Sequence, residues 1–113
     1  MFSIEHVDAR ELSTWLQGEK FLLLDVRTPG ETAYGIIPGA KLLPLHLLPL
    51  NVDKLKGEGK VVVYCQSGAR SAQACAFLAR QGIENTYNLA GGIMSWAGER
   101  LPIAAPDDDS SLL

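Results

Sequence analysis

The residues best suited to chemistry lie near the middle of the chain, where a cysteine follows a short apolar run. Residues Val61 to Tyr64 are three valines and a tyrosine, a pattern typical of a buried strand. The strand is expected to stop at Cys65, and a helix is expected to begin near Arg70 after a loop that contains Gly68. This order places a thiol at the carboxyl end of a strand and beneath a helix N-terminus, where ligands collect in open α/β sheets.

A cysteine in this position is expected to be reactive. The unpaired N–H groups of the first helical turn, together with the positive end of the helix dipole, favour an anion. We therefore expect the pKa of the Cys65 thiol to be lowered, which makes its thiolate a nucleophile near neutral pH. Gly68 allows the loop to turn its amides inward, and Arg70 adds a positive charge with a planar set of donors. The expected substrate-binding loop consists of Gln66, Ser67, Gly68, Ala69, Arg70 and Ser71.

The rest of the chain alternates strands and helices at short spacing, as in a single α/β domain. The expected strands cover residues 4–7, 21–26, 41–43, 61–64 and 86–89. The expected helices cover residues 9–17, 70–81 and 93–97, with shorter turns of helix after Pro29 and at 51–55. This alternation predicts a mostly parallel sheet with helices on both faces. The domain is expected to span residues 1–104, and the acidic segment 105–113 is expected to be a flexible tail.

Composition and charge exclude several classes of function. The 113 residues carry a net charge of −3, which does not provide the basic face that nucleic-acid binding requires. No apolar run approaches the roughly 18 residues of a membrane span, and the first residues do not resemble a signal peptide. The two cysteines, Cys65 and Cys75, fit neither a disulfide framework nor a common zinc pattern. We therefore expect a cytoplasmic protein without a metal or other cofactor.

Four motifs in this order resemble those of the single-domain rhodaneses, the thiosulfate sulfurtransferase-like family. The motifs are the loop 65–71, the segment 24–27 with Glu31, the segment 35–40, and the segment 89–93 with Trp96 and Pro102. The resemblance covers most of the chain and implies a rhodanese-like α/β fold with a central, mostly parallel five-stranded sheet. Two positions depart from the family pattern. Ile36 stands where the family usually has His, and the aromatic residue that often follows Glu31 is displaced to Tyr34.

The resemblance implies a thiosulfate sulfurtransferase that works through a persulfide on Cys65. The thiolate would accept the outer sulfur of thiosulfate or of another persulfide donor, and would pass it to cyanide, a thiol or a carrier protein. The implied partners are therefore a small-molecule donor and acceptor, with a sulfur-relay protein as a further partner. Asp25 and Arg27 are expected to brace the loop or the sheet edge rather than to react. Arg70 has two equally supported roles, binding an anionic ligand or pairing with a carboxylate such as Asp25.

Two other functions are compatible with parts of the pattern. One is a non-catalytic rhodanese-like interaction module, although such a module would often lose the cysteine that this chain retains. The other is a phosphatase or arsenate reductase, but related phosphatases have five residues between their Cys and Arg. Here four residues separate Cys65 from Arg70, which predicts a smaller loop suited to a sulfur atom. Cys75 lies among alanines in an expected helix, so we expect it to pack in the core rather than to act as a resolving thiol.

Overall fold

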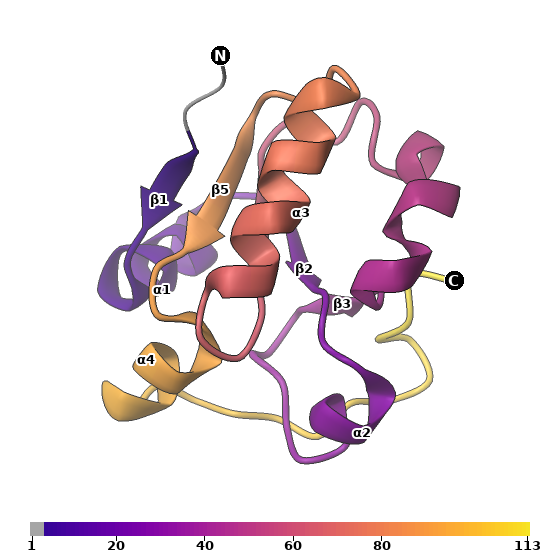
Figure 1. Cartoon of the computed structure of the whole chain (residues 1–113). Helices are drawn as coiled ribbons and strands as arrows, with labels where there is room; N and C mark the ends of the chain where they lie inside the picture. The colour runs from indigo at the N-terminus through magenta and orange to yellow at the C-terminus, as the bar shows by residue number, and fades with distance from the viewer. Residues whose placement is uncertain (1–3) are drawn as a thin grey trace.

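The computed structural model, which describes residues 4–113, is built around one five-stranded sheet in which all strand pairs are parallel (Figure 1). In spatial order the strands are β1 (Glu5–Val7), β5 (Thr86–Leu89), β4 (Val61–Tyr64), β2 (Leu22–Asp25) and β3 (Lys41–Leu42). All five strands lie within the residue ranges expected for them. The expected fold class, an α/β domain with a parallel five-stranded sheet, is confirmed.

The helices also begin and end close to the expected residues. They are α1 (Ala9–Gly18), α2 (Pro29–Thr32), α3 (Ala69–Arg80) and α4 (Gly92–Gly98), with 3-10 turns η1 (Leu45–Leu50) and η2 (Val52–Lys54). Helix α1 begins where it does because the Asp8 carboxylate accepts a hydrogen bond from the backbone N–H of Glu11, at 2.8 Å. Within residues 4–113 no helix has the length and apolar character that crossing a membrane would require.

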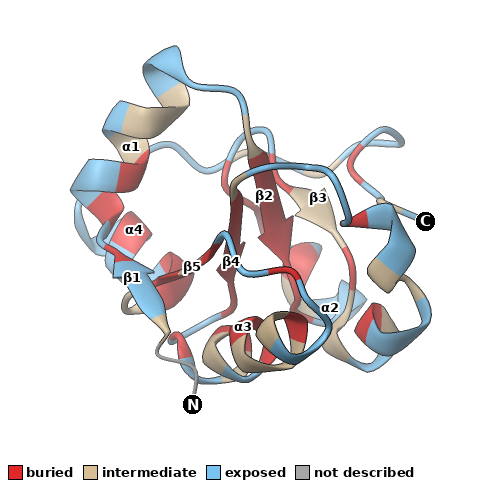
Figure 2. Cartoon of the chain, turned by 90° about the horizontal axis from the view of Figure 1, so that it is seen from above, coloured by how far each residue is buried: buried red, intermediate tan, exposed pale blue. Residues whose placement is uncertain are grey.

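Strands β2 and β4 are buried on both faces, which explains why their sequences are almost continuously apolar. Successive side chains of a strand point to opposite faces. Leu24 of β2 and Val63 of β4 therefore join one core cluster, to which α3 and η1 also contribute. Leu23 and Val62 join the other cluster, which includes residues of α1 and α4. Figure 2 shows β2 and β4 as buried ribbons in the middle of the molecule.

This topology brings several chain segments to one edge of the sheet. Strand β4 lies between β2 and β5, and all three strands run in the same direction. Their carboxyl ends therefore lie side by side, and the residues that follow each strand are neighbours. Cys65 follows β4, Asp25 ends β2, and Gly91 and Gly92 follow β5.

The acidic C-terminal segment 105–113, which we expected to be flexible, runs alongside β3. Its backbone pairs with β3: Leu42 donates to the carbonyl of Ser110 at 2.8 Å, and Leu112 donates to the carbonyl of Leu42 at 3.0 Å. Further back, Ile36 and Ala104 exchange two backbone hydrogen bonds of 2.8 Å. The segment therefore covers the free edge of β3, which limits pairing of that edge with other chains.

Candidate active site

Cys65 lies at the end of β4 with its sulfur enclosed by the loop that leads into α3. The residue is 1% exposed. The backbone N–H of Gly68 donates to Sγ at 3.1 Å, and the backbone N–H and hydroxyl of Ser71 are each 3.4 Å from Sγ. Gly68 has a φ of +104° and is the N-cap of α3, a conformation that favours glycine. The loop thus bends sharply enough to surround one sulfur atom with donors.

These donors decide the charge state of the thiol. Burial raises the pKa of Cys65, because a thiolate loses hydration inside the protein. Hydrogen bonds from the Ser71 hydroxyl and from the N–H groups of Ser71, Gly68 and Ser67 oppose this effect, and the pKa is lowered overall. A buried sulfur atom is therefore held in a place that favours its anionic, nucleophilic form.

Asn88, near the end of β5, organises the loop from the opposite side. Its Oδ1 accepts a hydrogen bond of 2.5 Å from the Ser71 hydroxyl, and its Nδ2 donates to the carbonyl of Gly68 at 3.2 Å. A serine hydroxyl has one hydrogen to donate, so Asn88 and Cys65 compete for that of Ser71. The Asn88 amide is buried and links two of the residues whose N–H groups contact Sγ, Gly68 and Ser71. The sequence pattern did not identify Asn88 as a site residue.

The two cations near the loop are both paired. Arg27 donates from Nε and Nη2 to the carboxylate of Asp25, with the Nη2 bond at 2.7 Å, and both side chains are buried. Nη2 also donates to the carbonyl of Gly35 at 2.8 Å. This pair thereby ties the end of β2 to the chain after α2, a bracing geometry that fits the expected role of Asp25 and Arg27.

Arg70 pairs with Glu31 and not with Asp25, the partner suggested from the sequence. Its two terminal nitrogens donate to the two carboxylate oxygens of Glu31 at 2.7 and 2.6 Å. This hydrogen bonding lowers the pKa of Glu31 to about 2, against the effect of burial. The pair joins the first turn of α2 to the first turn of α3, and both side chains are partly exposed. Arg70 also has its pKa raised, first by Glu31, with a smaller contribution from the charge of Cys65.

Helix α4 holds the loop by its backbone. The N–H groups of Ile93 and Met94 donate to the carbonyls of Cys65 and Gln66 at 3.0 and 3.1 Å. This close approach requires a glycine, because a Cβ on Gly92 would lie 2.6 Å from the carbonyl oxygen of Cys65. Gly92 thus has a direct structural role at the site.

The six residues of the expected binding loop are not equivalent. Ser67, Gly68 and Ser71 provide the groups that bind Sγ. The side chain of Gln66 instead lines an adjoining pocket, and Ala69 is exposed at the start of α3. Arg70 contacts Glu31 as described above. Among the residues from Ile4 onward, no cluster of three or more His, Cys, Asp or Glu gathers as a metal ion would require.

Two residues singled out in the sequence lie in the core. Ile36 is 2% exposed and packs in the cluster below α1 and α4. Cys75 is buried in α3, and burial raises the pKa of its thiol to about 11, with a hydrogen bond to Thr86 acting in the opposite direction. This environment disfavours the thiolate and fits the expected packing role of Cys75.

Comparisons with known proteins agree with this geometry. The model of the rhodanese-like domain family matches residues 8–99. A sulfurtransferase of Allochromatium vinosum is 48% identical over 105 residues, which cover 92% of this chain and 98% of that protein. The chain belongs to the rhodanese-like domain family.

Solved structures show the same fold. A rhodanese-related protein from Thermoplasma volcanium is 32% identical, with a TM-score of 0.81 over 88% of this chain and 97% of that chain. A rhodanese-like domain protein from Staphylococcus aureus is 30% identical, with a TM-score of 0.83 over 92% of this chain and 100% of that chain. The rhodanese-like fold expected from the motifs is therefore confirmed.

Proposed function

We propose that this chain is a sulfurtransferase that carries sulfane sulfur as a persulfide on Cys65. The observation that carries this proposal is the buried sulfur of Cys65 with N–H donors from Gly68 and Ser71 beside it. These donors favour the thiolate that must attack the sulfur donor, and the same cradle suits the anionic outer sulfur of the persulfide. The name of the Allochromatium vinosum relative supports the same reaction class.

The proposed reaction has two steps. In the first, the Cys65 thiolate attacks the outer sulfur of thiosulfate, the S–S bond of thiosulfate breaks, and sulfite leaves with the bonding electrons. In the second, cyanide or a thiol attacks the outer sulfur of the persulfide and Cys65 leaves as a thiolate. Neither step needs a metal or other cofactor. The N–H groups of the loop 66–71 are proposed to bind the anionic sulfur, with Asp25 and Arg27 in a supporting role.

Arg70 is proposed to assist an anionic donor from the rim of the loop. Its charge is largely balanced by Glu31, so its contribution to binding is expected to be smaller than that of a free arginine. The short loop between Cys65 and Arg70 continues to favour sulfur over a tetrahedral phosphate. An intact nucleophile with a preformed set of donors also favours an enzyme over a non-catalytic interaction module.

We further propose that the chain works in the cytoplasm with small-molecule donors and acceptors and with a sulfur-relay protein. The proposed reaction needs Cys65 as a free thiol, and both cysteines are unpaired in the structure. A reducing compartment keeps thiols in that state.

Intact-protein mass spectrometry after treatment with thiosulfate tests the proposal. Variant Cys75→Ala, which retains only Cys65, is expected to gain one sulfur atom that cyanide or dithiothreitol removes. Variant Cys65→Ser is expected to gain none while keeping its fold by circular dichroism. Absence of an adduct on Cys65 with thiosulfate and with low-molecular-weight persulfides would overturn the proposal.

A further inference from the structure

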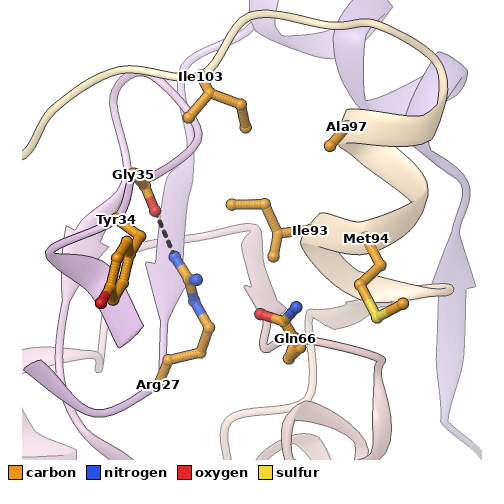
Figure 3. Close-up of a pocket in the computed structure, with 8 residues that line it drawn as sticks. All are labelled: Arg27, Tyr34, Gly35, Gln66, Ile93, Met94, Ala97 and Ile103. Carbon is orange, nitrogen blue, oxygen red and sulfur yellow. Dashed lines mark hydrogen bonds between the residues drawn. The ribbon is translucent and has the colours of Figure 1, made fainter. Parts of the chain in front are cut away.

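A pocket of about 430 Å³ adjoins the catalytic loop on the side facing α4 (Figure 3). Its lining combines apolar side chains of α4 with residues from the chain after α2 and from the C-terminal segment. The lining residues are Arg27, Tyr34, Gly35, Gln66, Ile93, Met94, Ala97 and Ile103. The volume lies within the range of pockets that bind small ligands or single side chains.

The rim of this pocket is unusually apolar for a protein surface. Five large apolar side chains are exposed in the part of the chain that the structure describes, and three of them, Tyr34, Met94 and Ile103, border this pocket. They are 93%, 58% and 44% exposed, respectively. Exposed apolar side chains gathered at one place mark surfaces that bind partner proteins.

The pocket offers hydrogen-bond donors but no uncompensated charge. The charge of Arg27 is balanced by the buried Asp25 carboxylate. The hydrogen bonds of its guanidinium to other described residues use Nε and Nη2. A fully buried side-chain nitrogen without a hydrogen-bond partner does not occur in residues 4–113. Nη1 of Arg27, which makes no hydrogen bond to these residues, is therefore not fully buried. Arg27 also lines this pocket. The amide of Gln66 also reaches the pocket. Such a lining suits a neutral peptide with a carbonyl group better than a carboxylate.

The pocket is connected to Cys65 by the chain and by backbone hydrogen bonds. Gln66, which lines it, directly follows Cys65. Ile93 and Met94, which also line it, donate their backbone N–H groups to the carbonyls of Cys65 and Gln66. A ligand seated here therefore lies beside the loop that would hold the persulfide.

We propose that this pocket receives an apolar, uncharged side chain next to the cysteine of an acceptor polypeptide. This inference rests on the proposed sulfurtransferase function and specifies its acceptor. The acceptor thiolate forms a bond to the outer sulfur of the Cys65 persulfide, and the bond between the two persulfide sulfurs breaks. Cys65 leaves as a thiolate, the acceptor carries the persulfide, and the proton lost by the acceptor thiol ends on the transferred sulfur or in solvent. Sulfane sulfur changes carrier, so no oxidant or reductant is consumed.

The test uses the full chain, loaded with persulfide and mixed with capped peptides of sequence Leu-Cys-Leu, Ser-Cys-Ser and Glu-Cys-Glu. For each peptide, the second-order rate constant for sulfur transfer is measured at equal thiolate concentration and divided by the rate constant for cyanide. Cyanide serves as the reference because this molecule is too small to need the pocket. The Leu peptide is expected to exceed the Glu peptide by about tenfold or more, a typical discrimination by one apolar pocket. Equal ratios for the three peptides would overturn the proposal.

Variants at the rim test whether this pocket causes the preference for the Leu peptide. Ile103→Ser and Met94→Gln, which change half-exposed side chains at the rim, are expected to reduce the Leu-peptide ratio by about fivefold. Leu50→Ser is the matched control, because Leu50 is an exposed apolar residue outside the pocket, and its ratio is expected to be unchanged. An equal loss in Leu50→Ser, or no loss in either rim variant, would overturn the assignment of the pocket.

Two further outcomes are distinguishable. If phenylmethanethiol, a small apolar thiol, reacts faster than the Leu peptide, the pocket serves a small molecule and the polypeptide acceptor is wrong. If persulfide loading fails, or cyanide removes no sulfur, the proposed function itself fails rather than the acceptor assignment.

Discussion

At the scale of single residues, the charge state of Cys65 depends on a few donors around one sulfur atom. Desolvation opposes ionisation, and hydrogen bonds from Ser71, Gly68 and Ser67 outweigh it. Asn88 positions two of these residues through its amide, accepting from Ser71 and donating to Gly68. The reactivity of the thiol therefore depends on a residue that lies on another strand and does not contact the sulfur in any hydrogen bond of the structure.

Variant Asn88→Asp tests this dependence. Aspartate keeps an acceptor for Ser71 but loses the donor to Gly68, and its negative charge disfavours a nearby thiolate. Thiolate formation should therefore need a higher pH, so the pH midpoint of Cys65 alkylation by iodoacetamide should rise and the rate at neutral pH should fall several-fold. The measurement is the pH–rate profile in a Cys75→Ala background.

The same charge change at a distant position provides the control. Variant Asn85→Asp, at the exposed residue directly before β5, should leave the alkylation profile unchanged. A profile of Asn88→Asp that superimposes on that of the parent protein would show that Asn88 does not influence the thiol.

At the scale of elements, the loop is held between two helix N-termini. The N-cap of α3, Gly68, and Ser71 in its first turn direct their backbone N–H groups at Sγ. Helix α4 directs the N–H groups of Ile93 and Met94 at the carbonyls of the loop. The loop therefore has fixed partners for its donors and for its acceptors, which preorganises the site before a substrate arrives.

Variant Gly92→Ala is expected to disturb this arrangement. A methyl group there would lie 2.6 Å from the carbonyl oxygen of Cys65, and Gly92 has a φ of +62° that side chains disfavour. We expect a loss of about 1–3 kcal/mol in the free energy of unfolding. We also expect persulfide formation to slow about tenfold, since small displacements of a reacting group are costly.

Urea denaturation and the rate of persulfide formation measure the two effects. Gly98→Ala, at the other end of α4, is the matched control because nothing lies within 4 Å of its added methyl group. That variant should keep the parent rate. Equal rates in Gly92→Ala and Gly98→Ala would contradict the proposed hold of α4 on the loop.

At the scale of the whole molecule, the C-terminal segment completes the sheet beyond β3. Strand β3 is only two residues long, and without the segment one of its edges would be open. The backbone hydrogen bonds between Leu42 and the segment close that edge, and Leu112 packs against the core cluster beneath α3. Ile103, two residues before this segment begins, borders the pocket beside the site.

Deletion of residues 110–113 should therefore destabilise the domain. The deletion removes two backbone hydrogen bonds to Leu42 and the partly buried side chain of Leu112. We expect a loss of about 1–3 kcal/mol in the free energy of unfolding, measured by urea denaturation. Deletion of Leu113 alone, an exposed side chain, should change stability by less than about 0.5 kcal/mol. A full deletion as stable as the parent would indicate that the segment is the flexible tail expected from its composition.

The local pattern was sufficient to predict most elements and to single out Cys65 as the candidate nucleophile. Valine and leucine runs mark β4 and β2, because a strand buried on both faces must be apolar throughout. Cys65, Gly68 and the start of α3 are contiguous, so their relation depends only on local backbone geometry. For the same reason the order of the four family motifs was enough to predict a rhodanese-like fold.

Contacts between distant segments could not be read in this way. The chain contains several carboxylates that could pair with Arg70. Glu31 is the partner because the fold places α2 beside α3. Asn88 had no distinguishing spacing, because its partners Gly68 and Ser71 lie on a different element. The path of the acidic C-terminal segment depends on the unpaired edge of β3, which exists only after the sheet has formed. Local covalent order thus specifies the reactive group, whereas long-range packing selects the partners that tune it.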